Sequence, residues 1–199
     1  MNRPAIIAGV LLIVAGLASW ASGLDLRLHP LLRLSPTSHL LWSAAHLTTL
    51  GSFLVMGPLA LFVVIGLRVR GRSPDAVWLF ATIASGRLAV EAIKLIVLRP
   101  RPPIADRLEL VTSWSFPSSH SAGTMLTCLA FAVASGRREA PPLAIAVALL
   151  IGETRLALGV HWPGDVLAGW GFALLWLGVA MRFRPARTGF AERIEVPDR

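Results

Sequence analysis

The sequence predicts an all-α fold, a polytopic membrane helix bundle of six transmembrane helices with both termini cytoplasmic. First, the chain is 55% hydrophobic and 15% charged, with a mean hydropathy of +0.67, a balance typical of membrane proteins. Second, six apolar segments have about the length that a bilayer crossing needs. Third, arginines gather in alternate connections between these segments. We interpret residues 1–199 as a single membrane domain.

The six expected helices follow from apolar runs of roughly 17 to 25 residues each. They are 5–24, 52–69, 76–98, 119–135, 141–159 and 164–183. The first run is too long for the core of a signal peptide and five more follow it, so we expect it to be retained. The third and fifth contain internal charges, which call for a functional or structural explanation.

The arginines predict the orientation of the bundle. Basic residues precede the first segment and follow the second, fourth and sixth, so all lie on one side if the helices alternate. They include Arg3, Arg68, Arg70, Arg72, Arg137, Arg138, Arg182, Arg184 and Arg187. The positive-inside rule makes that side cytoplasmic. Residues 25–51, 99–118 and 160–163 then face outward, and 185–199 form a cytoplasmic tail.

Residues 25–51 are too polar to cross a bilayer, although they are rich in leucine. We interpret them as an interfacial segment that contains a short helix capped by Thr37 or Ser38. Two roles are open for this segment. It forms a lid over a site on the outer face, or it is a connector that lies on the bilayer.

The net charge of +8 does not indicate a nucleic-acid partner. Basic chains often bind phosphate backbones, but here the basic residues lie in short loops between apolar segments, where membrane topology explains them. The single cysteine, Cys128, lies within an apolar run and has no cysteine to pair with in the chain. We expect membrane lipids as partners and make no prediction of the oligomeric state.

Three clusters of chemically active residues all fall on the predicted outer side. The first contains Lys94, Arg101 and Pro102; the second is Phe116-Pro-Ser-Ser-His120; the third contains Thr154, Arg155, His161 and Asp165. If the third to sixth helices pack as a bundle, these clusters converge in space.

Each cluster has an ordinary explanation when it is taken alone. Basic side chains at a helix end usually extend to the lipid headgroups, and this explanation fits Arg99 well. His120 alone is more often a packing residue at a helix entry. Asp165 is well placed to cap the sixth helix, because Pro163 suits its first position and an acid is favoured in its first turn.

Together the clusters suit the transfer of a phosphoryl group. Three cations, Lys94, Arg101 and Arg155, would neutralise and orient a phosphate. Backbone donors at the helix start formed by Ser118 and Ser119 add further contacts. Asp165 is spaced to fix the ring of His161, which makes that ring a nucleophile, and His120 supplies a separate acid.

The motifs Lys-x6-Arg-Pro, Pro-Ser-x-His and Arg-x5-His-x3-Asp, in this order, resemble the three signature motifs of the type-2 phosphatidic acid phosphatase family. That superfamily also includes undecaprenyl-diphosphate phosphatases and vanadium haloperoxidases. The motifs cover residues 94–165. Two positions depart from the usual pattern, with Ser119 in place of Gly and Thr154 in place of Ser. Neither removes a required group, so the resemblance implies an active enzyme.

The resemblance implies a role for each site residue. His161 attacks phosphorus and forms a phosphohistidine while Asp165 holds its ring, and His120 protonates the leaving oxygen and then activates water. Phosphate is bound by Lys94, Arg101, Arg155, Ser118 and Ser119. The resemblance implies no metal and no cofactor.

The implied function is hydrolysis of a lipid phosphate or diphosphate at the outer face of a bacterial inner membrane, with the site toward the periplasm. Recycling of undecaprenyl diphosphate fits a small six-span chain, although the sequence does not choose among lipid phosphates. A lipid phosphotransferase would use the same residues. A membrane transporter is a further alternative, but it leaves the three motifs unexplained.

The charges inside the third and fifth segments remain to be explained. Glu91 is spaced to reach both Arg87 and Lys94 on one helix face. Glu153 lies at a similar depth in the fifth segment. We hypothesise that Arg87, Glu91 and Glu153 form a buried polar network that supports Lys94 and Arg155; a purely structural pairing is the alternative.

Overall fold

The computed structural model describes residues 3–186, and over this part of the chain the secondary structure is helical without strands. This confirms the predicted all-α class. The helices are α1 (Arg3–Ala21), α2 (Leu24–Leu32), α3 (Leu40–Leu50), α4 (Phe53–Val69), α5 (Ser73–Val97), η1 (Ile104–Asp106), α6 (Ser119–Ser135), α7 (Ala140–Ala157), α8 (Pro163–Ala180) and η2 (Met181–Phe183).

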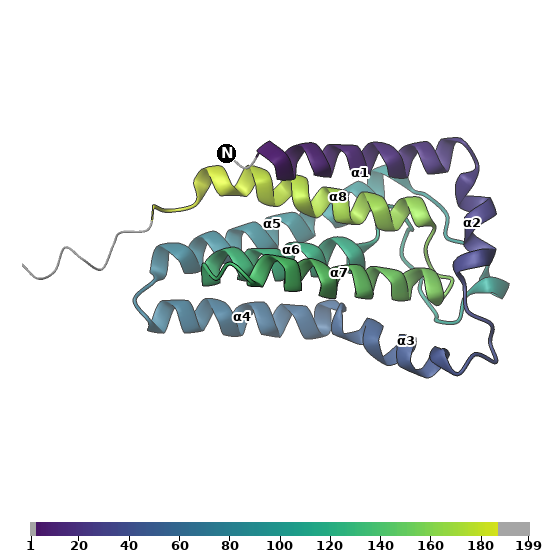
Figure 1. The fold of residues 1–199 in the computed structure, drawn as a ribbon, viewed down its shortest axis with the longest axis horizontal. Coiled ribbons are helices and arrows are strands. Elements are labelled where there is room, and N and C mark those ends of the chain that lie inside the picture. The colour runs from purple at the N-terminus through teal and green to yellow at the C-terminus, as the bar shows by residue number, and fades with distance from the viewer. Residues whose placement is uncertain (1–2, 187–199) are drawn as a thin grey trace, which may run out of the picture.

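The long helices run side by side, so that their connections lie at two ends of the bundle (Figure 1). Within residues 3–186, four helical spans are long and apolar enough to cross a membrane: α1, α5, α7, and α8 with η2. Helices α3 and α4 together add a fifth candidate, bent by 41° at their junction. Because α6 has only 17 residues, a sixth crossing and the cytoplasmic position of the termini stay predictions. Of the predicted tail, residues 187–199 lie outside the described part.

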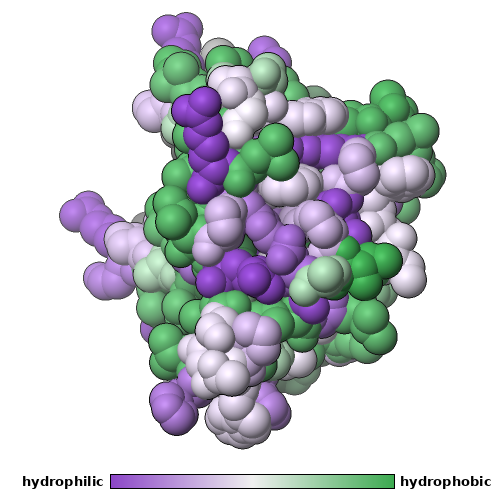
Figure 2. Space-filling model, turned by 90° about the vertical axis from the view of Figure 1, so that its right-hand side faces the viewer, coloured by the Kyte–Doolittle hydropathy of each residue, from purple (hydrophilic) through white to green (hydrophobic). Residues whose placement is uncertain are grey.

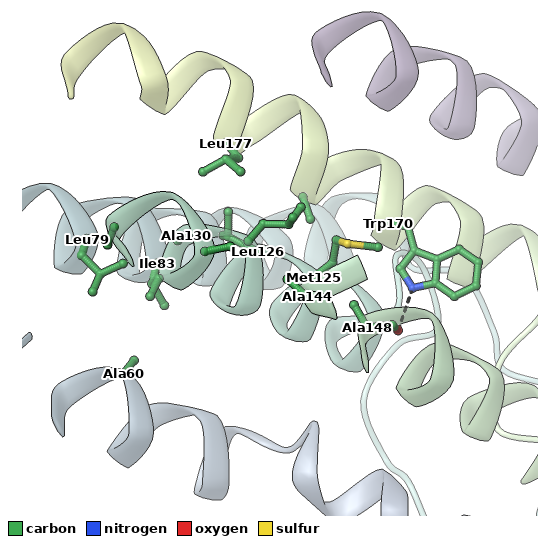
Figure 3. Close-up of a cluster of buried hydrophobic side chains, with 14 of the residues drawn as sticks. Ala60, Leu79, Ile83, Met125, Leu126, Ala130, Ala144, Ala148, Trp170 and Leu177 are labelled. Carbon is green, nitrogen blue, oxygen red and sulfur yellow. Dashed lines mark hydrogen bonds between the residues drawn. The ribbon is translucent and has the colours of Figure 1, made fainter. Parts of the chain in front are cut away.

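Helix α6 forms the centre of the bundle. It packs against α5, α7 and α8, and most of its side chains are buried, including Met125, Leu126 and Ala130. Figure 3 shows these residues meeting side chains from the surrounding helices. Trp170 on α8 donates a hydrogen bond to the carbonyl of Ala148 on α7, at 3.2 Å, so its indole nitrogen is satisfied within the core. This core fixes the ends of α5 and α7, and the starts of α6 and α8, relative to one another.

Helices α1 and α8 approach closely because glycines line their contact. A Cβ atom added to Gly9 would lie 2.6 Å from the carbonyl oxygen of Gly171, and one added to Gly16 would lie 2.5 Å from that of Gly164. Small residues spaced along a membrane helix allow the backbones of two helices to touch. The close contact brings the end of α1 to the start of α8.

The segment predicted to be interfacial contains two helices, α2 and α3. The N-cap of α3 is His39, without a side-chain cap hydrogen bond, so the predicted cap at Thr37 or Ser38 is wrong; the Ser38 hydroxyl, one residue earlier, accepts from the backbone N–H of Leu40 at 3.2 Å. Trp42 is exposed, but Asp25 and His29 of α2 are buried against the rest of the protein. Residues 25–51 therefore do more than lie on a surface, because part of the segment packs into the end of the bundle.

We predict that Gly16→Leu destabilises the protein, because its side chain would overlap the backbone of α8. Overpacking of this kind costs about 1–3 kcal/mol or more. The measurement is thermal unfolding in detergent. Gly66→Leu is the matched control, because nothing lies within 4 Å of a Cβ atom at Gly66. Equal stability of the two variants would contradict the proposed close contact.

Candidate active site

The three sequence clusters converge at one end of the bundle, around a cavity of about 250 Å³. Its lining residues are Phe53, Arg87, Glu91, Arg101, Glu109, Leu110, Val111, Ser113, Ser119, His120, Arg155 and His161. Figure 2 shows this end of the molecule, where hydrophilic residues gather in a central hollow between hydrophobic flanks. Both predicted catalytic histidines and two of the three predicted phosphate-binding cations line the cavity.

His161 and Asp165 form a buried pair at the start of α8. The ring Nδ1 of His161 lies 3.3 Å from a carboxylate oxygen of Asp165, and that same oxygen accepts hydrogen bonds from Ser115 Oγ at 2.5 Å and the backbone N–H of Trp162 at 3.0 Å. Asp165 thus caps α8 and contacts the histidine ring with one carboxylate. Both explanations that the sequence suggested for Asp165 apply together.

Arg101 crosses the cavity mouth to His161. Its guanidinium donates to the backbone carbonyls of Ser113, at 2.6 Å, and Val160, at 2.7 Å. It also lies 3.0 Å from Nε2 of His161. Because arginine only donates, Nε2 must be the accepting nitrogen, which leaves Nδ1 to carry the proton toward Asp165. The lone pair of Nε2 therefore faces the cavity and the cation that would bind phosphate.

The electrostatic setting keeps the His161 ring neutral. Burial lowers the pKa of His161 well below its usual range, and nearby cations, Arg101 first, lower it further. Burial also lowers the pKa of Arg101 to about 10, with a further decrease from Arg155, so Arg101 still carries its charge at neutral pH. A neutral imidazole beside a cation has the protonation state that a nucleophile requires.

Arg155 is almost completely buried at the end of α7. One guanidinium nitrogen donates to Thr48 Oγ1 of α3 at 2.6 Å and to Glu109 of the 99–118 loop at 2.7 Å. Its Nε has no hydrogen-bond partner in the described structure. Arg155 thus lines the cavity and forms an ion pair with Glu109, whose side chain is partly exposed. A phosphate group in the cavity would compete with Glu109 for this guanidinium.

Lys94 lies just outside the cavity lining. It is buried at the last turn of α5, where its ammonium donates to the carbonyl oxygen of Trp114 at 2.6 Å. It nonetheless lies close enough to His161 to contribute to the lowering of that ring's pKa. Phosphate binding by Lys94 stays a prediction, and the bond to Trp114 shows how the lysine also orders the loop that carries Arg101.

The start of α6 brings His120 and Ser119 to the cavity but turns Ser118 away. Ser118 is the N-cap of α6: its hydroxyl accepts from the backbone N–H of Ser121, and its own N–H donates to the Asp165 carbonyl at 3.0 Å. The Ser118 hydroxyl also accepts from the hydroxyl of Ser121 at 3.0 Å, and the residue is completely buried. Ser118 joins α6 to α8, whereas Ser119 and His120 can meet a ligand.

The predicted buried network of acids and arginine is wrong in part. Arg87 donates to the carbonyl of Ser119 at 3.3 Å, and the Ser119 hydroxyl donates to Glu91 at 2.7 Å. These residues line the cavity wall, and Glu91 is exposed there. Glu153 is exposed on α7 and does not join them. The direction of the Glu153 side chain depends on how α7 rotates against its neighbours, and spacing along the sequence does not give this rotation.

Several site residues have no counterpart in the sequence prediction. Arg99, which the sequence suggests is a headgroup contact, is instead 3% exposed and lies between two buried aspartates. One of these is Asp165 and the other is Asp25 of α2. Ser115, Thr48 and Glu109 also contact the predicted residues. The one sequence signal for Asp25 is its place as an acid directly after the first apolar segment. Its partner Arg99 lies far away in the chain, so spacing does not connect the two residues.

The geometry defines a helical membrane protein in which two histidines and two arginines of the three motifs line one cavity. The chain matches the PAP2 superfamily over residues 75–189, more than half of its length, and it belongs to that superfamily. This confirms the family that the three motifs indicated.

Named relatives and solved structures agree with this assignment. The decaprenylphosphoryl-5-phosphoribose phosphatase of Mycobacterium tuberculosis is 32% identical over 118 residues, which is 56% of this chain and 61% of the relative's length. Phosphatidylglycerophosphatase B of Bacillus subtilis is 28% identical over 138 residues, 65% of this chain and 68% of the relative. The matched region thus spans less than two thirds of the first of these relatives.

Two crystal structures show the same fold. One is a transmembrane PAP2-type phosphatidylglycerolphosphate phosphatase from Bacillus subtilis, with a TM-score of 0.79 and 23% identity, covering 94% of this chain and 98% of that one. The other is Aquifex aeolicus LpxE, with a TM-score of 0.63 and 24% identity, covering 80% and 95%.

The burial of neutral His161 predicts a pH-dependent stability. Because its folded pKa lies below the unfolded value of about 6.5, its contribution is complete above pH 6.5 and is lost as the pH falls toward the folded pKa. Between pH 7.5 and pH 5 we expect the wild type to lose up to about 2 kcal/mol more stability than His161→Asn. Thermal unfolding of both, beside a His46→Asn control at an exposed histidine, measures this difference. Parallel pH profiles for wild type and His161→Asn would contradict it.

Proposed function

We propose that this protein is a lipid phosphatase that hydrolyses a lipid phosphate or diphosphate through a phosphohistidine. The observation that carries this proposal is the convergence of His161, His120, Arg101 and Arg155 on one cavity. Membership of the PAP2 superfamily, whose named relatives are phosphatases, supports it.

The surroundings of the cavity favour a lipid over a soluble phosphate. An apolar groove of about 570 Å³ runs between α4 and α5, and it shares Phe53 and Arg87 with the site cavity. Its other lining residues are Gly57, Pro58, Ala60, Leu61, Val64, Phe80, Ile83, Ala84 and Leu88. A hydrocarbon chain in this groove would leave its phosphate beside Arg87, at the edge of the site.

The first step forms a bond between Nε2 of His161 and phosphorus and breaks the bond from phosphorus to the leaving oxygen. Asp165 holds the proton on Nδ1 and balances the positive charge that develops on the ring. Arg101 and Arg155 bind the phosphoryl oxygens, which draws Arg101 away from the Nε2 lone pair. His120 donates a proton to the leaving oxygen.

In the second step water attacks the phosphohistidine. His120 takes a proton from the water as the new oxygen–phosphorus bond forms and the nitrogen–phosphorus bond breaks. The products are inorganic phosphate and neutral His161. We propose that no metal or cofactor takes part. The proposed substrate class includes undecaprenyl diphosphate, a phosphorylated polyprenyl-phosphoryl sugar, and a phospholipid phosphate, since the proposed site residues would bind the phosphate that these lipids share.

The first test measures phosphate release by purified protein from a panel of these lipids, with and without EDTA. We expect His161→Asn to lower the rate by at least about three orders of magnitude, because it removes the nucleophile. His120→Asn should lower it about 10²–10⁴-fold. With an activated aryl phosphate, whose leaving group needs no acid, His120→Asn should accumulate label on His161.

The control for this test is His46→Asn, which changes an exposed histidine at the same end of the bundle and should keep wild-type activity. No phosphate release from any lipid would overturn the proposed function, and so would full activity in His161→Asn. Loss of activity with EDTA would overturn metal independence alone. Transfer of phosphate to an added alcohol in place of water would identify a phosphotransferase.

The proposed orientation, with six crossings and the site toward the periplasm of a bacterial inner membrane, predicts a labelling pattern. In a chain that lacks Cys128, a cysteine at Leu110 should react with a membrane-impermeant maleimide in whole cells. A cysteine at Arg137, exposed at the opposite end, should react only after permeabilisation. The reverse pattern would place the site on the cytoplasmic side.

A further inference from the structure

Behind His161 and Asp165, away from the cavity, lies a second buried ionic contact. One terminal guanidinium nitrogen of Arg99 donates a hydrogen bond to Asp165 Oδ1 at 2.6 Å, and the other donates to Asp25 Oδ2 at 2.5 Å. The two aspartates and the arginine are each 3% exposed or less. Arg99 therefore bridges the aspartate that holds the nucleophile to an aspartate on α2.

Asp25 is itself held rigidly at the start of α8. Its Oδ1 accepts hydrogen bonds from Ser19 Oγ of α1 at 2.7 Å and from the backbone N–H of Gly164 at 2.8 Å. A Cβ atom at Gly164 would lie 2.9 Å from the Asp25 carboxylate, so only glycine admits this contact. Asp25 thus accepts from a backbone N–H in the first turn of α8, where a negative charge is stabilised.

Two aromatic rings lie against the Arg99 guanidinium, and they line a small cavity of about 220 Å³ together with Asp25 and Arg99. The Arg99 guanidinium lies 4.3 Å from the ring centre of Trp20 and 5.7 Å from that of Trp162. Cation–π contacts of this kind support a positive charge where it is desolvated. In such surroundings each charge acts strongly on its neighbours, so the balance between the three charges affects the histidine.

We propose that Asp25 is a positioning residue for catalysis, which acts on His161 through Arg99 and Asp165; this rests on the proposed function. Two carboxylates and one guanidinium leave a net charge of −1 behind the ring. When Nε2 bonds to phosphorus, the ring becomes cationic, and this surplus negative charge stabilises it. Without Asp25, Arg99 would neutralise Asp165 and withdraw that support.

Asp25 is far in sequence from the three motifs, so its proposed role follows from the tertiary structure alone. Asp25 lies outside residues 75–189, the range over which the superfamily match extends. Asp25 lies in the first turn of α2, and the preceding helix α1 packs on the start of α8 through Gly16 and Gly164. The N-terminal helices thus supply a charge to the site as well as apolar surface.

The test compares Asp25→Asn with the wild type in the phosphate-release assay. The change keeps the side-chain shape and removes the charge, so we expect kcat to fall about 10-fold to 100-fold, the size typical of residues that hydrogen-bond to the ligands of metal sites, with KM changed less than about twofold. Formation of the labelled phosphohistidine should slow by the same factor. Wild-type kcat, or a defect confined to KM, would overturn the proposal.

A double variant separates charge balance from simple structural damage. Asp25→Asn with Arg99→Gln removes both charges and restores −1 on Asp165, while the new amide can still donate to its carboxylate. We therefore expect the double variant to recover at least about threefold in kcat relative to Asp25→Asn. A structural role alone predicts a double variant as slow as, or slower than, the single one, and this result would overturn the proposal.

The matched control is Asp106→Asn, which breaks a partly exposed ion pair between Arg33 at the end of α2 and Asp106 of η1. This pair lies at the same end of the bundle, and the kcat of Asp106→Asn should stay within about twofold of wild type.

If Asp25→Asn does not fold, the double variant tests the proposal alone, because removing both partners of a buried pair is tolerated better than removing one. Its kcat should then lie within about tenfold of wild type, and a larger loss overturns the proposal. An inactive wild type would instead refute the proposed function.

Discussion

The buried carboxylate of Asp165 is the point on which the site depends. An isolated carboxylate in the interior of a helix bundle would be costly, so each of its oxygens must find donors. The protein supplies them from Arg99, Ser115, the backbone of Trp162 and the ring of His161. The same carboxylate therefore caps α8, anchors the 99–118 loop and orients the ring of His161. Loss of any one donor would disturb the other functions as well.

This arrangement explains why the helices at the site end must pack so closely. Gly16 and Gly164 bring the backbones of α1 and α8 into contact, which places Asp25 and Trp20 beside Arg99. On the other side of the His161 ring, the cations Arg101 and Arg155 face the cavity. The ring of His161 thus lies between a buried anionic contact and a cationic pocket. This polarity suits a ring that becomes positive while it binds a negative group.

Residue spacing predicted much of this site correctly. Lys94, Arg101, His120, Arg155, His161 and Asp165 were predicted to gather at one end of the bundle, and the structure brings them together there. Motif spacing succeeds because each motif sits at one helix end, where local geometry decides which way a side chain points. The predictions that Glu153 joins a buried network and that Arg99 contacts lipid headgroups were wrong, because local geometry does not decide the positions of these side chains. Their surroundings depend on the rotation of a helix and on the path of a loop, and neither follows from local spacing.

The sequence by itself determined the helical class, the apolar segments and the chemistry of the motifs, because these depend on side-chain type and on short periodicities. Tertiary structure alone decided that Asp25 meets Arg99, that Thr48 and Glu109 meet Arg155, and that Ser118 caps α6 away from the cavity. These contacts join residues up to 107 positions apart. Such pairs form only when buried charges from different helices must satisfy one another in a space with little water.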